Sequence, residues 1–171
     1  APLNFEENTQ AALDTLCRAI SGQEISYDVA SNASNIYGEC VGQVVGGNLA
    51  IISTLVGTND QLELKKKILF IEEIGEAVYA IDRMLWQLKK SGQLSEIAGL
   101  IVGGMTAMKD SEVPYGISVE EVILAHVRDL NVPVAFDFPA GHIDDNRTII
   151  LGRESSLLVN ENGTFLNQAA L

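Results

Sequence analysis

Two short segments, far apart in the sequence, contain the residue types best suited to proton transfer. Glu72 and Glu73 end the apolar run 68–71, and His142 follows the Pro-Ala-Gly turn 139–141. A carboxylate and an imidazole are two of the three groups of a nucleophilic triad. The third group would be an activated serine or cysteine, yet no segment resembles the Gly-x-Ser-x-Gly turn that presents such a serine. The residues therefore predict the acid and base of a hydrolase without its nucleophile.

The same residues have simpler interpretations. His142 taken alone is best explained as a surface histidine hydrogen-bonded to a neighbouring aspartate. Glu72 and Glu73 could cap the following helix and interact with its dipole. Since adjacent strand residues face opposite sides, one of them could instead orient His142 while the other binds backbone or substrate. A carboxylate pair for sugar hydrolysis would need an aromatic binding surface, and only 6% of the residues are aromatic.

A glycine turn at Gly46 and Gly47 leads into a predicted helix that Asn48 would cap. Amides exposed at a helix start can hold an anion such as a carboxylate, which makes these three residues candidates for substrate binding. The turn lacks the lysine of a nucleotide-binding loop, and a tight turn with an asparagine cap explains the same residues. His126 lies within a predicted helix and receives little functional weight. No cluster has metal-ligand spacing, so no metal is predicted.

Composition limits the class of protein. The 171 residues suffice for one domain, and 47% hydrophobic residues with a mean hydropathy of +0.17 argue against disorder. A net charge of -12 disfavours nucleic acid and anionic membranes as partners. No apolar stretch reaches the roughly 18 residues of a membrane span, and no signal peptide is visible. Two isolated cysteines, of which Cys17 is expected on a buried helix face, indicate a reducing compartment, so we expect a cytoplasmic protein.

The order of predicted elements favours one mixed α/β domain over residues 1–171. Hydrophobic spacing and capping residues predict helices from Asn4 to Ile20, from 48 to about 56, from 77 to 90 and from 118 to 130. Short apolar or alternating runs predict strands at 25–29, 36–45, 68–71, 97–102 and 132–138, followed by hairpin strands at 147–151, 156–159 and 164–166.

Five segments, taken in order, carry a resemblance to a known family. They are 46–49 with 55–58, the strand and glutamates 68–76, the helix 79–88 with Ile81-Asp82-Arg83-Met84-Leu85, the strand 98–103, and Gly141-His142 with Asn146. Together they resemble the C-terminal domain of the LD-carboxypeptidase family, serine peptidases also called muramoyltetrapeptide carboxypeptidases. The resemblance covers nearly the whole chain. Two departures are Ile149-Ile150-Leu151-Gly152 in place of Leu-Pro-x-Gly, and Glu73 in place of the commoner aspartate.

The resemblance implies a swivelling β/β/α-type domain with Glu72 as the triad acid and His142 as the general base. The nucleophilic serine would belong to an N-terminal domain that is absent here, so we expect the isolated chain to be inactive. The implied reaction is hydrolysis of the bond between an L-centre diamino acid and D-alanine in murein tetrapeptides, without metal or organic cofactor; a related branch cleaves a peptide–nucleotide antibiotic. The family also suggests a homodimer.

Two functions from other classes remain open. The domain could be a non-catalytic binding module that holds ligands through the turn at Gly46–Asn48. It could also be a phosphocarrier-type swivelling domain with His142 as the phosphate acceptor.

Overall fold

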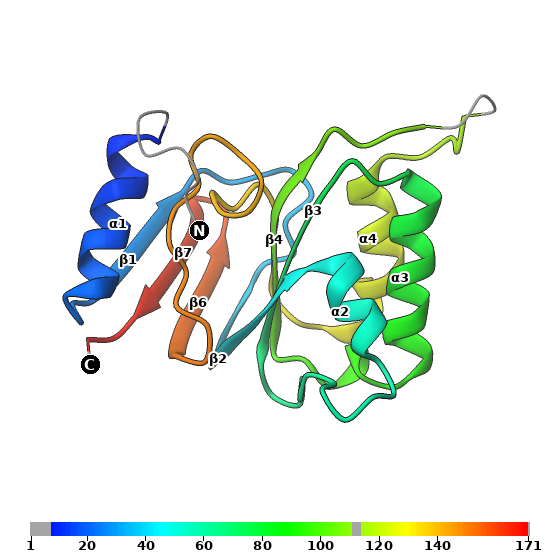
Figure 1. The fold of residues 1–171 in the computed structure, drawn as a ribbon, viewed down its shortest axis with the longest axis horizontal. Coiled ribbons are helices and arrows are strands. Elements are labelled where there is room, and N and C mark those ends of the chain that lie inside the picture. The colour runs from blue at the N-terminus through cyan, green and yellow to red at the C-terminus, as the bar shows by residue number, and fades with distance from the viewer. Residues whose placement is uncertain (1–7, 111–113, 171) are drawn as a thin grey trace.

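The computed structural model describes residues 8–110 and 114–170. A seven-stranded mixed sheet with the strand order β1-β7-β6-β2-β3-β4-β5 forms its centre (Figure 1). The strands are β1 (Ile25–Val29), β2 (Gly38–Asn48), β3 (Ile68–Ile74), β4 (Gly99–Thr106), β5 (Val134–Ala135), β6 (Glu154–Asn160) and β7 (Gly163–Gln168). The helices are α1 (Gln10–Ile20), α2 (Leu49–Leu55), α3 (Val78–Lys90) and α4 (Val119–Val127), with short 3-10 turns at Leu94–Glu96 and Arg128–Leu130.

Strand β2 joins two differently built halves of the sheet. Its residues 38–43 pair antiparallel with β6, and its residues 44–48 pair parallel with β3. Strands β3, β4 and β5 continue the parallel half, and α2, α3 and α4 connect successive strands and pack together beside it (Figure 1). Strands β6, β7 and β1 form an antiparallel half next to α1. The α/β fold class predicted from the sequence is confirmed.

Alternation along β3 divides the interior into two cores. Leu69 and Ile71 join the core beneath α2, α3 and α4, which also contains Leu85. Ile68 and Phe70 join a second core on the other face of the sheet, built mainly from β1, β6, β7 and the segment around residue 140. A strand buried on both faces reads as a continuous apolar run, which is why 68–71 was recognisable in the sequence.

The N-terminal helix differs from its prediction. It begins at Gln10 with Thr9 as its N-cap, and the predicted cap Asn4 lies outside the described residues. Cys17 is exposed, so its predicted burial is wrong. The predicted face is also wrong at Ile20, which is 79% exposed, because α1 buries its small residues Ala12 and Thr15 instead.

Other boundaries shift, and one predicted strand is wrong. The 36–45 strand is β2 and extends to residue 48, while the 132–138 strand contracts to β5. The hairpin of β6 and β7 is confirmed. Residues 147–151 form no strand, because the side chain of Gln168 takes both backbone hydrogen bonds of Ile150. Among the described residues, no helix combines the length and apolarity that crossing a bilayer requires.

Candidate active site

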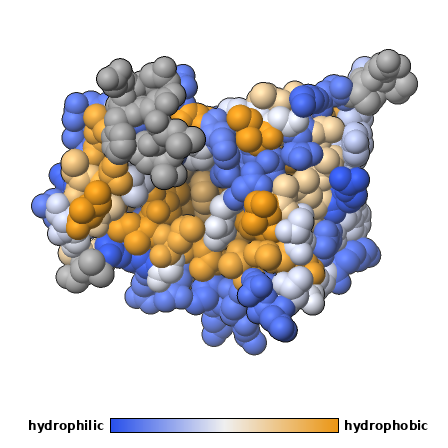
Figure 2. Space-filling view, in the orientation of Figure 1, coloured by the Kyte–Doolittle hydropathy of each residue, from blue (hydrophilic) through white to orange (hydrophobic). Residues whose placement is uncertain are grey.

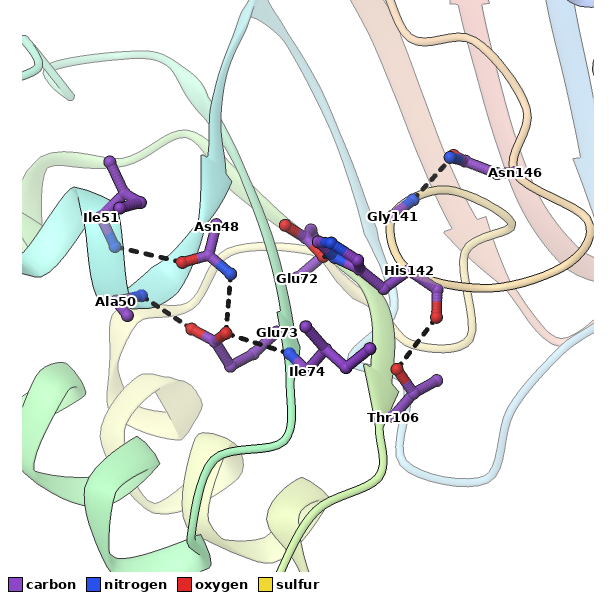
Figure 3. Close-up of polar contacts among 10 residues, drawn as sticks. All are labelled: Asn48, Ala50, Ile51, Glu72, Glu73, Ile74, Thr106, Gly141, His142 and Asn146. Carbon is purple, nitrogen blue, oxygen red and sulfur yellow. Dashed lines mark hydrogen bonds and ion pairs between the residues drawn. The ribbon is translucent and has the colours of Figure 1, made fainter. Parts of the chain in front are cut away.

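The structure brings Glu72 and His142 together, although 70 residues separate them (Figure 3). His142 Nδ1 lies 2.5 Å from Glu72 Oε2. An ionised carboxylate only accepts hydrogen bonds, so Nδ1 carries the proton and Nε2 is left as the basic nitrogen. The Glu72 side chain is 8% exposed whereas that of His142 is 51% exposed. This pair, called the dyad below, therefore has a buried acid and an imidazole open to solvent.

Glu72 reaches this position from the end of β3. From Ile71 to Glu73 strand β3 advances by two residues while its partner β4 advances by three, from Val102 to Met105, so β4 carries a bulge opposite Glu72. Bulges re-aim side chains at sheet ends and occur frequently beside active sites. Strand β3 itself keeps its alternation, so Glu72 faces the His142 segment and Glu73 faces α2, as predicted.

Glycines allow the segment around His142 to lie directly against the sheet. Gly141 has φ +104°, and a Cβ built there would lie 2.7 Å from Glu72 Cβ. A Cβ at Gly103 would lie 2.4 Å from the carbonyl oxygen of Ala140. Any larger residue at either position would push the imidazole away from its acid.

Hydrogen bonds fix the backbone on both sides of the imidazole. The Gly104 amide donates to the Ala140 carbonyl at 2.9 Å, and the Thr106 hydroxyl donates to the His142 carbonyl at 2.9 Å. The Gly141 amide donates to the side-chain oxygen of Asn146 at 2.9 Å (Figure 3). Thr106 was not recognised from the sequence, because nothing local signals a hydroxyl whose partner lies 36 residues away.

Glu73 has a different environment, on the α2 side of β3. It is 3% exposed, and its carboxylate accepts hydrogen bonds from Asn48 Nδ2 at 2.6 Å, the Ala50 amide at 2.8 Å and its neighbour's amide at position 74 at 3.0 Å (Figure 3). Asn48 in turn caps α2 by accepting from the Ile51 amide. The sequence left two roles open for the second glutamate, binding of backbone or binding of substrate. The observed contacts of Glu73 are to backbone amides and to the cap residue Asn48.

The predicted turn at Gly46 and Gly47 is wrong, because both glycines belong to β2 and pair with β3 next to these glutamates. Gly46 is crowded, because a Cβ there would lie 1.9 Å from the Phe70 carbonyl oxygen, whereas nothing lies within 4 Å of one at Gly47. Asn48 pairs with Glu72 in the β2–β3 register. The three candidate binding residues thus share one edge of the sheet with the dyad, and their contact with a substrate stays a prediction.

Two cavities flank the dyad's segment of chain. One of about 280 Å³ lies between α1 and residues 140–151, and its lining includes Leu13, Phe70 and Gly141. The other, of about 250 Å³, lies between the end of β4 and the start of α4, and its lining includes Glu120 and Ile143. Binding sites of open α/β sheets lie beyond the carboxyl ends of the strands, where the second cavity is found.

Neither of the two cysteines is placed as a nucleophile for the dyad. Burial raises the pKa of the Cys40 thiol to about 11, so it stays protonated and unreactive near neutral pH. Cys17 is exposed on α1, on a different element from the dyad. Within residues 8–110 and 114–170, no three His, Cys, Asp or Glu side chains are grouped so that they could hold a metal ion.

His126 forms a second imidazole–carboxylate pair with a different setting. It is 3% exposed, and its Nε2 lies 2.7 Å from Asp82 Oδ1, between α4 and α3. Asp82 also accepts from the Tyr115 hydroxyl at 3.0 Å, and this hydrogen bond raises the pKa of the phenol. The burial of this imidazole makes the pair a link between helices rather than a site, in keeping with the small weight given to His126.

The fold agrees with that of known proteins. The model of the LD-carboxypeptidase C-terminal domain matches residues 41–157. This chain belongs to the LD-carboxypeptidase family. It is 37% identical over 119 residues to a Synechocystis protein named as a carboxypeptidase. It is 30% identical over 117 residues to the murein tetrapeptide carboxypeptidase of Pseudomonas aeruginosa. Each match covers 68% of this chain.

A solved structure extends the likeness to α1 and the antiparallel half. The muramoyltetrapeptide carboxypeptidase of Oxalobacter formigenes superposes with a TM-score of 0.85 and 27% identity over 94% of this chain. The matched region makes up 55% of that chain, and 38% of the Synechocystis and Pseudomonas proteins. The chain thus spans well under two thirds of these LD-carboxypeptidase relatives.

Proposed function

We propose that this chain is the half of a serine LD-carboxypeptidase that supplies the triad acid Glu72 and the general base His142. The hydrogen bond from His142 Nδ1 to the buried Glu72 carboxylate supports this proposal most directly. It fixes the tautomer that leaves Nε2 as a base, and the imidazole side chain is half exposed. The nucleophilic serine would come from an N-terminal domain of the full-length protein.

The proposed reaction follows from these positions. His142 Nε2 takes the proton of the serine hydroxyl as the serine oxygen attacks the peptide carbonyl. Glu72 stabilises the imidazolium, which then protonates the leaving amine of D-alanine. Water next gives a proton to Nε2 and attacks the acyl-enzyme, and the imidazolium returns that proton to the serine oxygen as the shortened peptide leaves.

The proposed substrate is a murein tetrapeptide cleaved between its L-centre diamino acid and its terminal D-alanine. The names of the Pseudomonas and Oxalobacter proteins support it. Gly46, Gly47 and Asn48 are proposed to contact this substrate, since they lie at the same sheet edge as the dyad. Glu73 is proposed to act on the substrate only through Asn48, which it holds.

The deciding experiment is D-alanine release from a murein tetrapeptide by the polypeptide that includes the N-terminal domain. We expect His142→Ala and Glu72→Gln each to lower kcat by roughly 10³-fold or more, the range found when triad members are removed. Glu161→Gln, in the exposed β6–β7 turn, is the matched control and should leave activity unchanged. Full activity in His142→Ala would favour the binding module, and an acid-labile phosphate on His142 would favour the phosphocarrier.

The chain by itself is proposed to be inactive. Without the nucleophilic serine of the other domain, the dyad has no nucleophile to activate, so this polypeptide should release no D-alanine. Measurable turnover by the chain alone, abolished by His142→Ala, would contradict the separation of nucleophile and base between two domains.

A further inference from the structure

The segment that carries His142 is a loop whose two ends are joined by hydrogen bonds of the consecutive residues Asn146 and Arg147. We call residues 139–147 the histidine loop. The Gly141 amide donates to Asn146 Oδ1 at 2.9 Å, and the Arg147 amide donates to the Pro139 carbonyl at 2.8 Å. The chain therefore returns to its starting point four to five residues after His142, and Asn146 provides the side-chain half of that closure.

Asn146 holds Gly141, whose backbone has more conformational freedom than that of any residue with a side chain. Gly141 has φ +104°, a region that its missing side chain makes accessible but does not favour over others. His142 follows it directly, so a rotation at Gly141 swings the imidazole relative to Glu72. The hydrogen bond from its amide to Asn146 opposes this rotation, together with the Thr106 hydroxyl that donates to the His142 carbonyl.

The far end of the histidine loop is attached independently. Asp145 accepts a hydrogen bond from the Thr9 hydroxyl at 2.5 Å, and its other oxygen accepts from Arg147 Nε and Nη2 at 3.0 and 2.8 Å. The amide of Thr148 donates to the Thr15 hydroxyl at 3.0 Å. Both threonines belong to α1 or its cap, so loss of the Asn146 contact should loosen the 141–142 end, which then keeps only the hydrogen bonds to its carbonyls, while the rest of the loop stays attached.

We propose that Asn146 is a positioning residue for His142: its side-chain oxygen holds the Gly141 amide and so keeps the imidazole on Glu72. The consequence for catalysis rests on the proposed function, but the consequence for the imidazole does not. Asn146 touches neither the imidazole nor, in the proposed reaction, the reacting atoms.

The first test measures the imidazole in this chain without any assay of activity. Nitrogen-15 shifts of histidine rings report which ring nitrogen carries the proton, and this chain has only two histidines. His142 should show the proton on Nδ1, and His126, bonded to Asp82 through Nε2, serves as an internal reference. In Asn146→Ala we expect His142 to shift toward a mixture of tautomers, with His126 unchanged.

Two further variants separate a lost acceptor from a disturbed fold. Asn146→Asp keeps an oxygen in the same place and should restore the Nδ1 proton, measured at high salt to screen its added charge. Asn146→Ser, whose hydroxyl is one bond too short to reach, should behave as the alanine variant does. Asn162→Ala, in the exposed β6–β7 turn, is the matched control. An unchanged His142 spectrum in both the alanine and serine variants would overturn the proposal.

The second test uses the polypeptide that includes the N-terminal domain. Misplacing a catalytic group by about 1 Å costs about 10²-fold in rate, so Asn146→Ala should lower kcat by roughly 10- to 100-fold and change KM little. Asn146→Asp should recover most of that loss. A kcat that stays at the wild-type value in Asn146→Ala would overturn the positioning role. If no variant and no wild type releases D-alanine while the spectra change as expected, the proposed function fails and the positioning of His142 stands.

Discussion

Glu72 and Glu73 are neighbours on one strand, yet their hydrogen-bond partners differ. Glu72 shares one side-chain hydrogen bond, with an exposed imidazole, while Glu73 receives three hydrogen bonds from the start of α2 and its own neighbour. Both are nearly inaccessible to solvent. Substitution of Glu73 would leave buried hydrogen-bond donors without an acceptor, whereas substitution of Glu72 would affect only a half-exposed imidazole.

Glu73→Gln should destabilise the fold more than Glu72→Gln. An amide NH₂ in place of one carboxylate oxygen would meet a donor from either Asn48 or Ala50, so a buried donor would lose its acceptor at a cost of about 1–3 kcal/mol. Urea unfolding of the two variants, with Glu161→Gln as the exposed control, measures the difference. Equal losses in both glutamate variants would contradict this assignment.

Gly141→Ala tests the close approach of the histidine loop to the acid. Its Cβ would lie 2.7 Å from Glu72 Cβ at a φ of +104°, whereas an alanine at Gly152 would meet nothing within 4 Å at a φ of +80°. Gly152→Ala should therefore incur only backbone strain of roughly 1–2 kcal/mol. Gly141→Ala should in addition displace the imidazole, which the nitrogen-15 tautomer signal of His142 would report; an undisturbed signal would show that the loop can yield without moving the dyad.

At the scale of elements, α1 holds the histidine loop through a carboxylate that titrates. Burial raises the pKa of Asp145. Hydrogen bonds from Arg147 and Thr9, together with the charge of Arg147, lower it by more, so the pKa lies below its ordinary value. A carboxylate with a depressed folded-state pKa stabilises the fold above its unfolded pKa of about 3.9. That stabilisation is lost as the pH falls through the folded value.

Attachment of α1 should consequently weaken in acid. Between neutral pH and pH of about 4 the stability contributed by Asp145 should stay constant, and below that it should decline. Asp145→Asn should remove this part of the acid dependence while lowering stability at neutral pH. Urea unfolding across the acid range measures both effects, with Asp28→Asn on the exposed side of β1 as the control. An identical pH dependence in Asp145→Asn and wild type would refute the attachment.

Elements were predictable where local pattern and tertiary contact agree. The capping box of Ser118 and Glu121 and the apolar face of α3 were readable, because both follow from spacing within one helix. The segment 147–151 was misread because Thr148-Ile149-Ile150 has strand-like composition, while Gln168, from a distant strand, takes the hydrogen bonds of Ile150. Residue types predicted only that one of the two glutamates could orient His142, and the resemblance singled out Glu72. The position of the imidazole also depends on Thr106, whose hydroxyl bonds to a carbonyl 36 residues away that no local spacing indicates.

At the scale of the whole molecule, β2 makes one sheet out of two halves. Val44, fully buried, stands where β2 changes partner from β6 to β3. The two cores lie on opposite faces of the parallel strands and share β3, whose alternate side chains enter each. Because neither core can be lost without exposing β3, we expect both halves to unfold together.

Core truncations in the two halves should therefore be felt across the whole chain. Leu85→Ala in α3 and Leu157→Ala in β6 each remove a side chain that is at most 1% exposed and should each cost about 2–5 kcal/mol. Trp86, the only tryptophan, lies on α3 against the ring of His126 and reports the helical half alone, whereas far-ultraviolet circular dichroism reports the entire fold. In Leu157→Ala the two signals should shift to lower urea by the same amount and coincide. A tryptophan transition that keeps its wild-type midpoint while the dichroism becomes biphasic would show that the halves unfold separately, and the shared strand would then not be what joins them.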